Sequence, residues 1–287
     1  MKMKYTGSEL VYSAFVYVFI TFAGIITLYP FLYVIAMAFS MPDAVLTNKV
    51  WLYPVGFNIN AFAFVLSGKD FWGYYYNTIW YTVVGTVLNV IFTVMAGYPI
   101  SRRQFFLRRP ITFFYTLTMF INGGLIANYL LVAKWLNLYN SRWALILPTL
   151  IGVWNLLICR AFFMSLPEEL FECARIEGAG EGRVIIKIVV PLSKPIISVL
   201  ALYYAVGHWN SFFPALLYLS KLSLMPVQIY LRRMLIMGDT ENINREAMMF
   251  LQIRYAIILV SILPILSVYP FIQKYFVKGV LIGSVKG

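Results

Sequence analysis

Side chains that could do chemistry are scarce in this 287-residue chain, and five of its eleven acidic residues fall within residues 167–195. Acidic and basic side chains alternate through this stretch, and long apolar runs flank it on both sides. We call residues 165–195 the polar loop. Its charged side chains are Glu168, Glu169, Glu172, Arg175, Glu177, Glu181, Arg183, Lys187 and Lys194. This composition suits a docking surface for another protein or, as the commoner alternative, a solvated connection between two apolar segments.

A second group of polar and aromatic side chains lies inside the apolar runs. Polar groups at such positions tend to face the interior of a helix bundle or a water-filled cavity, so these residues are candidates for contact with a solute. The commoner alternative is hydrogen bonding between helices and close packing. The candidates are Asn122, Asn155, Tyr203, Tyr204, His208, Trp209 and Asn210.

The remaining chemistry-bearing residues predict neither an enzyme nor a metal site. The chain has one histidine, and its sequence contains no metal-ligand spacing and no Walker phosphate loop. Cys159 and Cys173 are expected to be free thiols. We therefore expect no catalytic residue, no metal and no cofactor bound by this chain itself.

The elements that carry these residues are predicted to be membrane-spanning helices. The chain is 61% hydrophobic and 12% charged, whereas soluble proteins carry about a quarter charged residues. Continuous apolar runs of the roughly twenty residues that a helix needs to cross the bilayer core indicate helices rather than barrel strands. The sequence thus predicts one all-α integral membrane domain over residues 1–287. Its six predicted spans are residues 10–39, 75–101, 111–133, 143–164, 196–217 and 252–276.

Basic residues set the expected orientation. Between the second and third spans lie Arg102, Arg103, Arg108 and Arg109 without an acidic residue, and we call residues 102–109 the arginine loop. Such loops stay in the cytoplasm, which places the polar loop and both termini there too. We interpret these arginines as determinants of topology, with contact to lipid headgroups or to a partner protein as the alternative. The net charge of +12 is typical of such loops and does not indicate nucleic-acid binding.

Two longer segments then lie on the outer side of the membrane. Residues 40–74 suit an interfacial loop or short helix, since they mix prolines with tryptophan and tyrosine. Residues 220–251 are expected to contain a short amphipathic helix near 227–237. The first apolar run is longer than the apolar core of a signal peptide, so we expect it to be retained as a span.

All eleven acidic residues lie outside the six predicted spans. Carriers driven by protons or sodium usually need a carboxylate within the membrane, because an ionisable group is their coupling device. An ion-coupled carrier is therefore disfavoured, and an uphill transporter with this sequence would need another source of energy.

The polar loop contains a specific motif. It reads Glu172-Cys173-Ala174, then Glu177-Gly178-Ala179, then Pro191-Leu192 and Pro195. This pattern resembles the EAA loop of ATP-binding-cassette (ABC) importer permeases, whose usual form is close to EAAxxDGA followed by PLxxP. Cys173 in place of Ala and Glu177 in place of Asp are mild departures. The resemblance covers nearly the whole chain, residues 279–287 included, and is greatest to the carbohydrate-uptake (maltose-type) branch, especially permeases for complex oligosaccharides such as alginate or pectin fragments.

The resemblance implies a type I ABC importer permease fold in the bacterial cytoplasmic (inner) membrane. A helix of the polar loop, the coupling helix, would sit in a cleft of a cytoplasmic ATPase subunit. Closure of two such subunits on ATP would then drive the spans between inward-facing and outward-facing states. Glu172 would meet polar groups of the ATPase, Ala174 would permit close packing and Gly178 would provide a turn. The residues implied in coupling are Glu172, Cys173, Ala174, Glu177, Gly178, Ala179 and Pro191.

The same resemblance implies a set of partners. These are a second related permease, two cytoplasmic subunits that bind ATP and Mg, an extracytoplasmic solute-binding protein and a sugar substrate. ATP would be hydrolysed by the partner subunits and not by this chain. A substrate-delivery protein would meet the outer side, where Met225-Pro226 and Arg232-Arg233 lie.

Three alternatives remain open on the sequence. An importer of the same class could carry another solute, such as glycerol phosphate, and a cationic cavity would favour that reading whereas a neutral or aromatic lining would favour sugar. A secondary carrier is disfavoured by the missing intramembrane acids. A membrane-embedded enzyme is disfavoured by the missing acid–base pairs and metal cluster.

Overall fold

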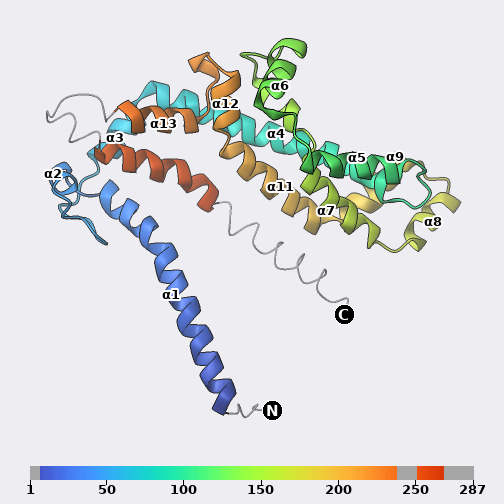
Figure 1. Cartoon of the computed structure of the whole chain (residues 1–287), viewed down its shortest axis with the longest axis horizontal. Coiled ribbons are helices and arrows are strands. Elements are labelled where there is room, and N and C mark those ends of the chain that lie inside the picture. The colour runs from blue at the N-terminus through green and yellow to red at the C-terminus, as the bar shows by residue number, and fades with distance from the viewer. Residues whose placement is uncertain (1–6, 238–250, 268–287) are drawn as a thin grey trace. The chain divides into compact units, whose positions relative to one another are not determined.

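The computed structural model describes residues 7–237 and 251–267 (Figure 1). Every regular element in these ranges is helical and none is a strand, which confirms the all-α class for the described chain. The C-terminal signature at 279–287 and the end of the sixth predicted span lie outside the described residues.

The chain divides into two compact units. One comprises Met1–Lys69 with Leu231–Leu263, and the other comprises Asp70–Tyr230 with Pro264–Gly287. One domain over residues 1–287 stays a prediction.

In the first unit, α1 (Gly7–Ala38) corresponds to the first predicted span. Its apolar side chains are exposed along most of its length, and only Ala36, Met37 and Ala38 are buried. This buried end packs on α2 (Pro42–Leu46) and the loop after it, and α3 (Asn60–Ser67) follows. A long apolar helix with uncovered sides suits a surrounding of lipid or of another membrane protein.

In the second unit, α4 (Lys69–Ser101) corresponds to the second predicted span. α1 and α4 are the two helices of the described chain that are long and apolar enough to cross a membrane unaided. Pro99 lies in the last turn of α4.

The third and fourth predicted spans are not single straight helices. α5 (Arg108–Phe120) meets α6 (Gly124–Leu130) and η1 (Leu131–Trp135) at a bend of 119°. Gly124 has a φ of +80° at this break, a conformation that glycine adopts without strain. The helical stretch η2–η3 (Arg142–Leu145 and Leu147–Thr149) meets α7 (Val153–Met164) at 47°. The helices over 111–133 and 143–164 are therefore each divided by a bend, and the two spans stay a prediction.

The fifth predicted span is also divided. α11 (Lys194–Trp209) ends well before residue 217, and α12 (Phe213–Tyr218) begins after a break. Pro214 near the start of α12 fits a helix entry but not a helix interior. With each bent pair taken as one span, the described residues hold up to five spans, so six spans stay a prediction.

Shorter helices complete the described chain. η5 (Leu222–Leu224) leads into α13 (Val227–Met237), which confirms the helix expected near 227–237. A further apolar helix spans Leu251–Ser267 within the range of the sixth predicted span.

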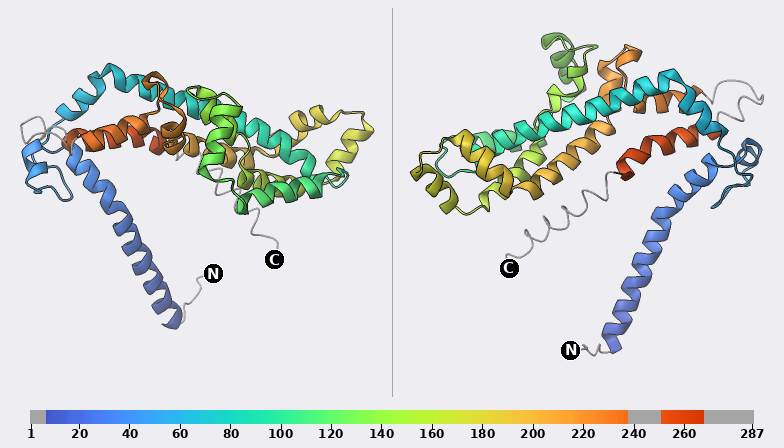
Figure 2. Two further views of the ribbon diagram at one scale, coloured as in Figure 1. Left: turned by 45° about the horizontal axis from the view of Figure 1, so that its top comes forward. Right: turned by 180° about the vertical axis from the view of Figure 1, so that it is seen from behind.

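The core of the second unit joins α4, α7 and α11 to the polar loop (Figures 1 and 2). Both figures show the helices of the polar loop, α8 and α9, together at one end of this unit. The residues buried there are Val94, Tyr98, Cys159, Phe163, Phe171, Ala174, Val184, Val189, Ile196, Val199, Leu200 and Tyr204. The polar loop is therefore packed against α4, α7 and α11.

Candidate functional site

The polar loop forms two short helices separated by a turn, as predicted. α8 (Glu169–Ile176) is followed by Gly178 at a φ of +73°, and then by α9 (Glu181–Val184). A π-helical turn, η4 (Ile185–Val189), and α10 (Val190–Leu192) carry the chain to an 85° bend before α11. Carboxylates in the first turn of α8 face the positive end of its helix dipole, which favours the helix.

The two faces of α8 differ sharply. Phe171 and Ala174 are buried in the core of their own chain. Glu172, Cys173 and Glu177 are exposed, and the side chain of Ile176 is 87% exposed. Ala174 faces inward, so its small size permits close packing within this chain, and its role in coupling stays a prediction. The surface open to a partner consists of the exposed residues.

Arg102, interpreted from the sequence as a topology determinant, is buried and ties three elements together. Its Nη2 donates to the carbonyl oxygen of Phe163 in the last turn of α7. Its Nη1 lies 3.4 Å from Oε2 of Glu168, and its Nε donates to Oγ of Ser101 at 3.0 Å. The guanidinium also lies 4.0 Å from the ring centroid of Phe171 in α8. Burial lowers the pKa of Arg102 from its ordinary value, and Glu168 opposes that shift.

A second tie joins α4 to the other helix of the loop. The hydroxyl of Tyr98 donates to Oε2 of Glu181 at 2.5 Å, and Oε1 of the same carboxylate lies 3.9 Å from Nε of Arg175. Tyr98 and Arg102 are four residues apart, so they share one side of the helix end. The start of α8 and the start of α9 are thereby both held to α4.

A cavity of about 680 Å³ lies among α11, α12 and the stretch between η2 and α7. Four solute-path candidates line it, namely Tyr203, Tyr204, His208 and Asn210, as do Thr149, Ser211, Phe212 and Phe213. Its lining contains no Asp, Glu, Lys or Arg. Aromatic faces beside hydroxyl, amide and imidazole groups are suited to a neutral, hydroxyl-rich ligand.

The polar lining is held by hydrogen bonds to α4 that the sequence analysis missed. Nε2 of His208 lies 2.8 Å from Oδ1 of Asn89, whose Nδ2 donates to the carbonyl oxygen of Thr149 at 2.6 Å. The hydroxyl of Tyr204 lies 2.7 Å from Oγ1 of Thr93 and accepts a hydrogen bond from the backbone N–H of Gly152 at 2.9 Å. Asn89 and Thr93 lie four residues apart in a span, a spacing that could have singled them out.

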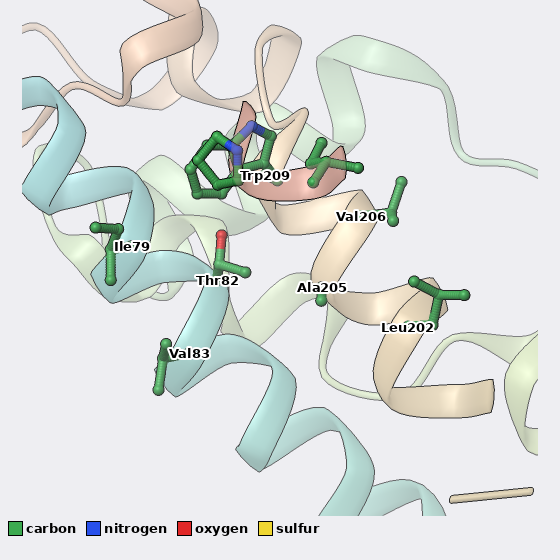
Figure 3. Close-up of a pocket in the computed structure, with 9 residues that line it drawn as sticks. Ile79, Thr82, Val83, Leu202, Ala205, Val206 and Trp209 are labelled. Carbon is green, nitrogen blue, oxygen red and sulfur yellow. The ribbon is translucent and has the colours of Figure 1, made fainter. Parts of the chain in front are cut away.

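The other candidates lie elsewhere. Trp209 lines a separate apolar pocket of about 210 Å³ between α4 and α11, which Figure 3 shows together with Ile79 and Val83. Asn122 is exposed at the break before α6, where its Oδ1 accepts from the N–H of Gly124 at 2.9 Å. Asn155 is half-buried in α7 and does not line the larger cavity. The structure thus brings four of the seven candidates together.

The described residues contain no group of three or more His, Cys, Asp and Glu side chains that could hold a metal ion. Cys159 is buried and Cys173 is exposed, and both are free thiols as predicted. Pro191 lies exposed in α10, and Ala179 is half-buried after the turn.

Residues 89–282 match the family model described as the binding-protein-dependent transport system inner membrane component. Protein LplC of Bacillus subtilis (strain 168) is 42% identical over 92% of this chain and 91% of its own length. The polygalacturonan/rhamnogalacturonan transport system permease protein YtcP of the same organism is 38% identical over 95% of this chain and 97% of its own.

Two solved structures of ABC transporter chains are also similar to this chain. A chain from the crystal structure of a bacterial ABC transporter involved in the import of the acidic polysaccharide alginate superposes with a TM-score of 0.88. It shares 32% sequence identity and covers 96% of this chain and 100% of its own. A second chain, from a bacterial alginate ABC transporter in complex with an alginate pentasaccharide-bound periplasmic protein, has a TM-score of 0.62 at 16% identity and shares the fold.

Proposed function

This chain belongs to the inner membrane components of binding-protein-dependent transport systems, and from that membership we propose that it is the permease subunit of an ATP-driven importer of oligosaccharides. The inference of a sugar substrate rests on one observation. The chain is similar over nearly its full length to a permease named for polygalacturonan and rhamnogalacturonan. The similarity to a chain of the alginate importer points to the same class, oligosaccharides derived from polysaccharides. Such permeases move solute and leave hydrolysis of ATP to partner subunits.

The cavity supports a sugar over a phosphorylated solute. A phosphate group is bound most strongly by arginine, lysine or several backbone N–H groups. The lining instead offers Tyr203 and Tyr204 as flat apolar faces, with Asn210 and His208 as hydrogen-bonding groups. Glycerol phosphate is therefore the less favoured substrate. In the proposal these four residues contact the oligosaccharide as it crosses the membrane.

The exposed face of α8 supports docking of an ATPase subunit. Its exposed residues include Glu172, Ile176 and Glu177, and they leave one side of the helix open to a partner, while Phe171 and Ala174 hold the other side in the core of the chain. In the proposal α8 is the coupling helix, with Glu172, Cys173 and Glu177 on the contact face and Gly178 forming the turn. Movement of the ATPase subunits then reaches the membrane helices through the polar loop.

The assembly follows from the same proposal. It contains a second related permease, two subunits that bind ATP and Mg, and a solute-binding protein on the outer side. Six spans with both termini in the cytoplasm are part of it. The arginine loop supports this orientation.

Purification of the chain from its native membrane in mild detergent tests the assembly. We expect a cytoplasmic ATPase subunit and a second permease to copurify with it. Recovery of this chain alone in several detergents, with no partner crosslinked through the exposed thiol of Cys173, would contradict the proposal and favour an ion-coupled carrier.

A further inference from the structure

We propose that Arg102 is a positioning residue for energy coupling, which locks the polar loop to the inner end of α4 so that movement of α8 is passed to the membrane helices. This inference rests on the proposed docking of an ATPase on α8. It gives the residue a role different from that of a topology determinant, which any positively charged side chain fills.

The contacts of Arg102 suit a lock because each goes to a different element. The carbonyl oxygen of Phe163 belongs to the last turn of α7, where backbone acceptors have no partner within the helix. Glu168 is the residue immediately before α8, and the ring of Phe171 lies within α8 itself. Arg102 follows the last residue of α4. One side chain therefore joins the ends of α4, α7 and α8.

The lock depends on the shape of the side chain as well as on its charge. A guanidinium carries five N–H donors in a planar fork and can stack on an aromatic face. Here Nε, Nη1 and Nη2 each have a different acceptor, while the carbon at the centre of the fork lies over Phe171. A lysine ammonium keeps the charge but cannot reach these acceptors from one plane.

α4 carries the connection from this lock to the cavity. Within α4, Tyr98 bonds Glu181 of α9, and five and nine residues earlier in the same helix Thr93 and Asn89 bond Tyr204 and His208. A displacement of the loop that moves α4 thus also moves groups bonded to the cavity lining. Contiguous contacts alone do not prove coupling, so the test measures transmission itself.

The experiment compares Arg102→Lys with Arg103→Lys in the complete transporter purified with its partners. Both substitutions keep the positive charge of the arginine loop, and Arg103 is exposed. The reporter is a cysteine introduced at Ser211, which lines the cavity. Its rate of reaction with a maleimide, followed by peptide mass, is measured with and without ATP plus vanadate. ATP hydrolysis and the amount of bound ATPase subunit are measured on the same samples.

We expect ATP plus vanadate to change the labelling rate in the parent and in Arg103→Lys alike. In Arg102→Lys that change falls by about tenfold, within the usual range of coupling between sites, while hydrolysis and bound ATPase remain near the parental level. A merely structural role would lower the amount of assembled complex without changing the response of each complex.

Glu168→Gln provides a second route should Arg102→Lys reduce the yield. This substitution removes the carboxylate partner of Arg102 at nearly constant side-chain volume, and we expect it to reduce the labelling response less than Arg102→Lys does. Because the two residues belong to one network, combining the substitutions should cause no greater loss than Arg102→Lys alone. Two results would overturn the proposed role of Arg102 while leaving the proposed function intact. One is an unchanged labelling response in Arg102→Lys, and the other is a double variant, Arg102→Lys with Glu168→Gln, whose loss of response equals the sum of the two single losses. A parent complex without an ATPase subunit would instead overturn the proposed function, and the lock with it.

Discussion

At the scale of single residues, the cavity depends on a close approach of α4 to α11. A Cβ atom added at Gly85 would lie 2.4 Å from Nε2 of His208, which no real contact allows. The absence of a side chain at Gly85 lets His208 reach Asn89. The hydrogen bond between His208 and Asn89 beside the cavity therefore requires glycine at position 85 as well as the two polar side chains.

Gly85→Ala is accordingly expected to displace the imidazole and break its hydrogen bond to Asn89. The loss of a buried hydrogen bond together with overpacking destabilises by about 1–3 kcal/mol. Thermal unfolding of the purified protein in detergent measures this. Gly73→Ala is the matched control, since its Cβ would meet open space in the same helix, and an equal loss of stability in both variants would contradict the explanation.

Tyr203 tests the contact of the cavity with sugar. It is 43% exposed and lines the cavity, so Tyr203→Ala removes an aromatic face without opening the core. By analogy with aromatic pairs, whose geometry contributes about 0.5–1.5 kcal/mol, we expect up to about a tenfold rise in the substrate concentration for half-maximal uptake. Tyr203→Phe keeps the ring and should stay near the parental value. Equal uptake by all three proteins would remove Tyr203 from the substrate path.

Gly178 tests the turn of the polar loop. Its φ of +73° costs a residue other than glycine about 1–2 kcal/mol, and β-branched residues tolerate it least. Gly178→Val should therefore misplace α8 and reduce the ATPase subunit that copurifies, with the membrane helices still folded. Gly182→Ala, where the added Cβ meets open space, is the control. Full recovery of the ATPase with Gly178→Val would show that the turn is not needed for docking.

At the scale of elements, α4 is held at both ends. At its C-terminal end, Tyr98 and Arg102 contact the polar loop. Near its other end, Asn77 donates to the carbonyl oxygens of Ser223 and Met225, at 2.8 and 3.2 Å, and accepts from Arg142 at 3.0 Å. The hydroxyl of Tyr81 donates to the carbonyl oxygen of Leu224 at 2.7 Å. One long helix therefore contacts the polar loop, the cavity and the segment around η5.

Asn77→Leu is expected to free the segment around η5. The variant leaves two carbonyl oxygens and Arg142 without their amide partner, a loss of about 1–3 kcal/mol for unsatisfied groups. Cleavage by trypsin after the exposed Lys221 should become roughly ten times faster. Tyr76→Phe, at the neighbouring position, keeps the aromatic ring near Arg142 and should leave the rate unchanged. A variant Asn77→Leu as resistant as the parent would refute this anchoring.

Elements whose structure depends on local composition alone were predicted better than those that depend on contacts between distant residues. The apolar runs of α1 and α4 and the glycine turn at Gly178 follow from local composition, and the structure has them near the expected places. The bends at Gly124 and before α7 were missed because average hydropathy does not register a change of direction. The burial of Arg102 was missed because its partners, Phe163, Glu168 and Phe171, lie some sixty residues away in the chain.

At the scale of the whole molecule, the proposed function makes this chain one of two permease subunits that together form the transport path. Its sequence has no Walker phosphate loop, α8 exposes one face, and the lining of the cavity contains no Asp, Glu, Lys or Arg. Similar chains are named for the transport of polygalacturonan and rhamnogalacturonan and for the import of the acidic polysaccharide alginate. The energy source, the second half of the path and the protein that delivers the substrate are all expected to come from partners.

Uptake into liposomes that contain the complete transporter with its binding protein tests whether this chain takes part in ATP-driven import of oligosaccharides. The probes are radiolabelled trigalacturonate, a neutral arabinotriose and glycerol 3-phosphate, each with and without ATP inside the vesicles. We expect at least one trisaccharide to accumulate only when ATP is present, and to accumulate equally well when a protonophore is added. Accumulation of glycerol 3-phosphate alone, or uptake that needs no ATP and is abolished by the protonophore, would contradict it.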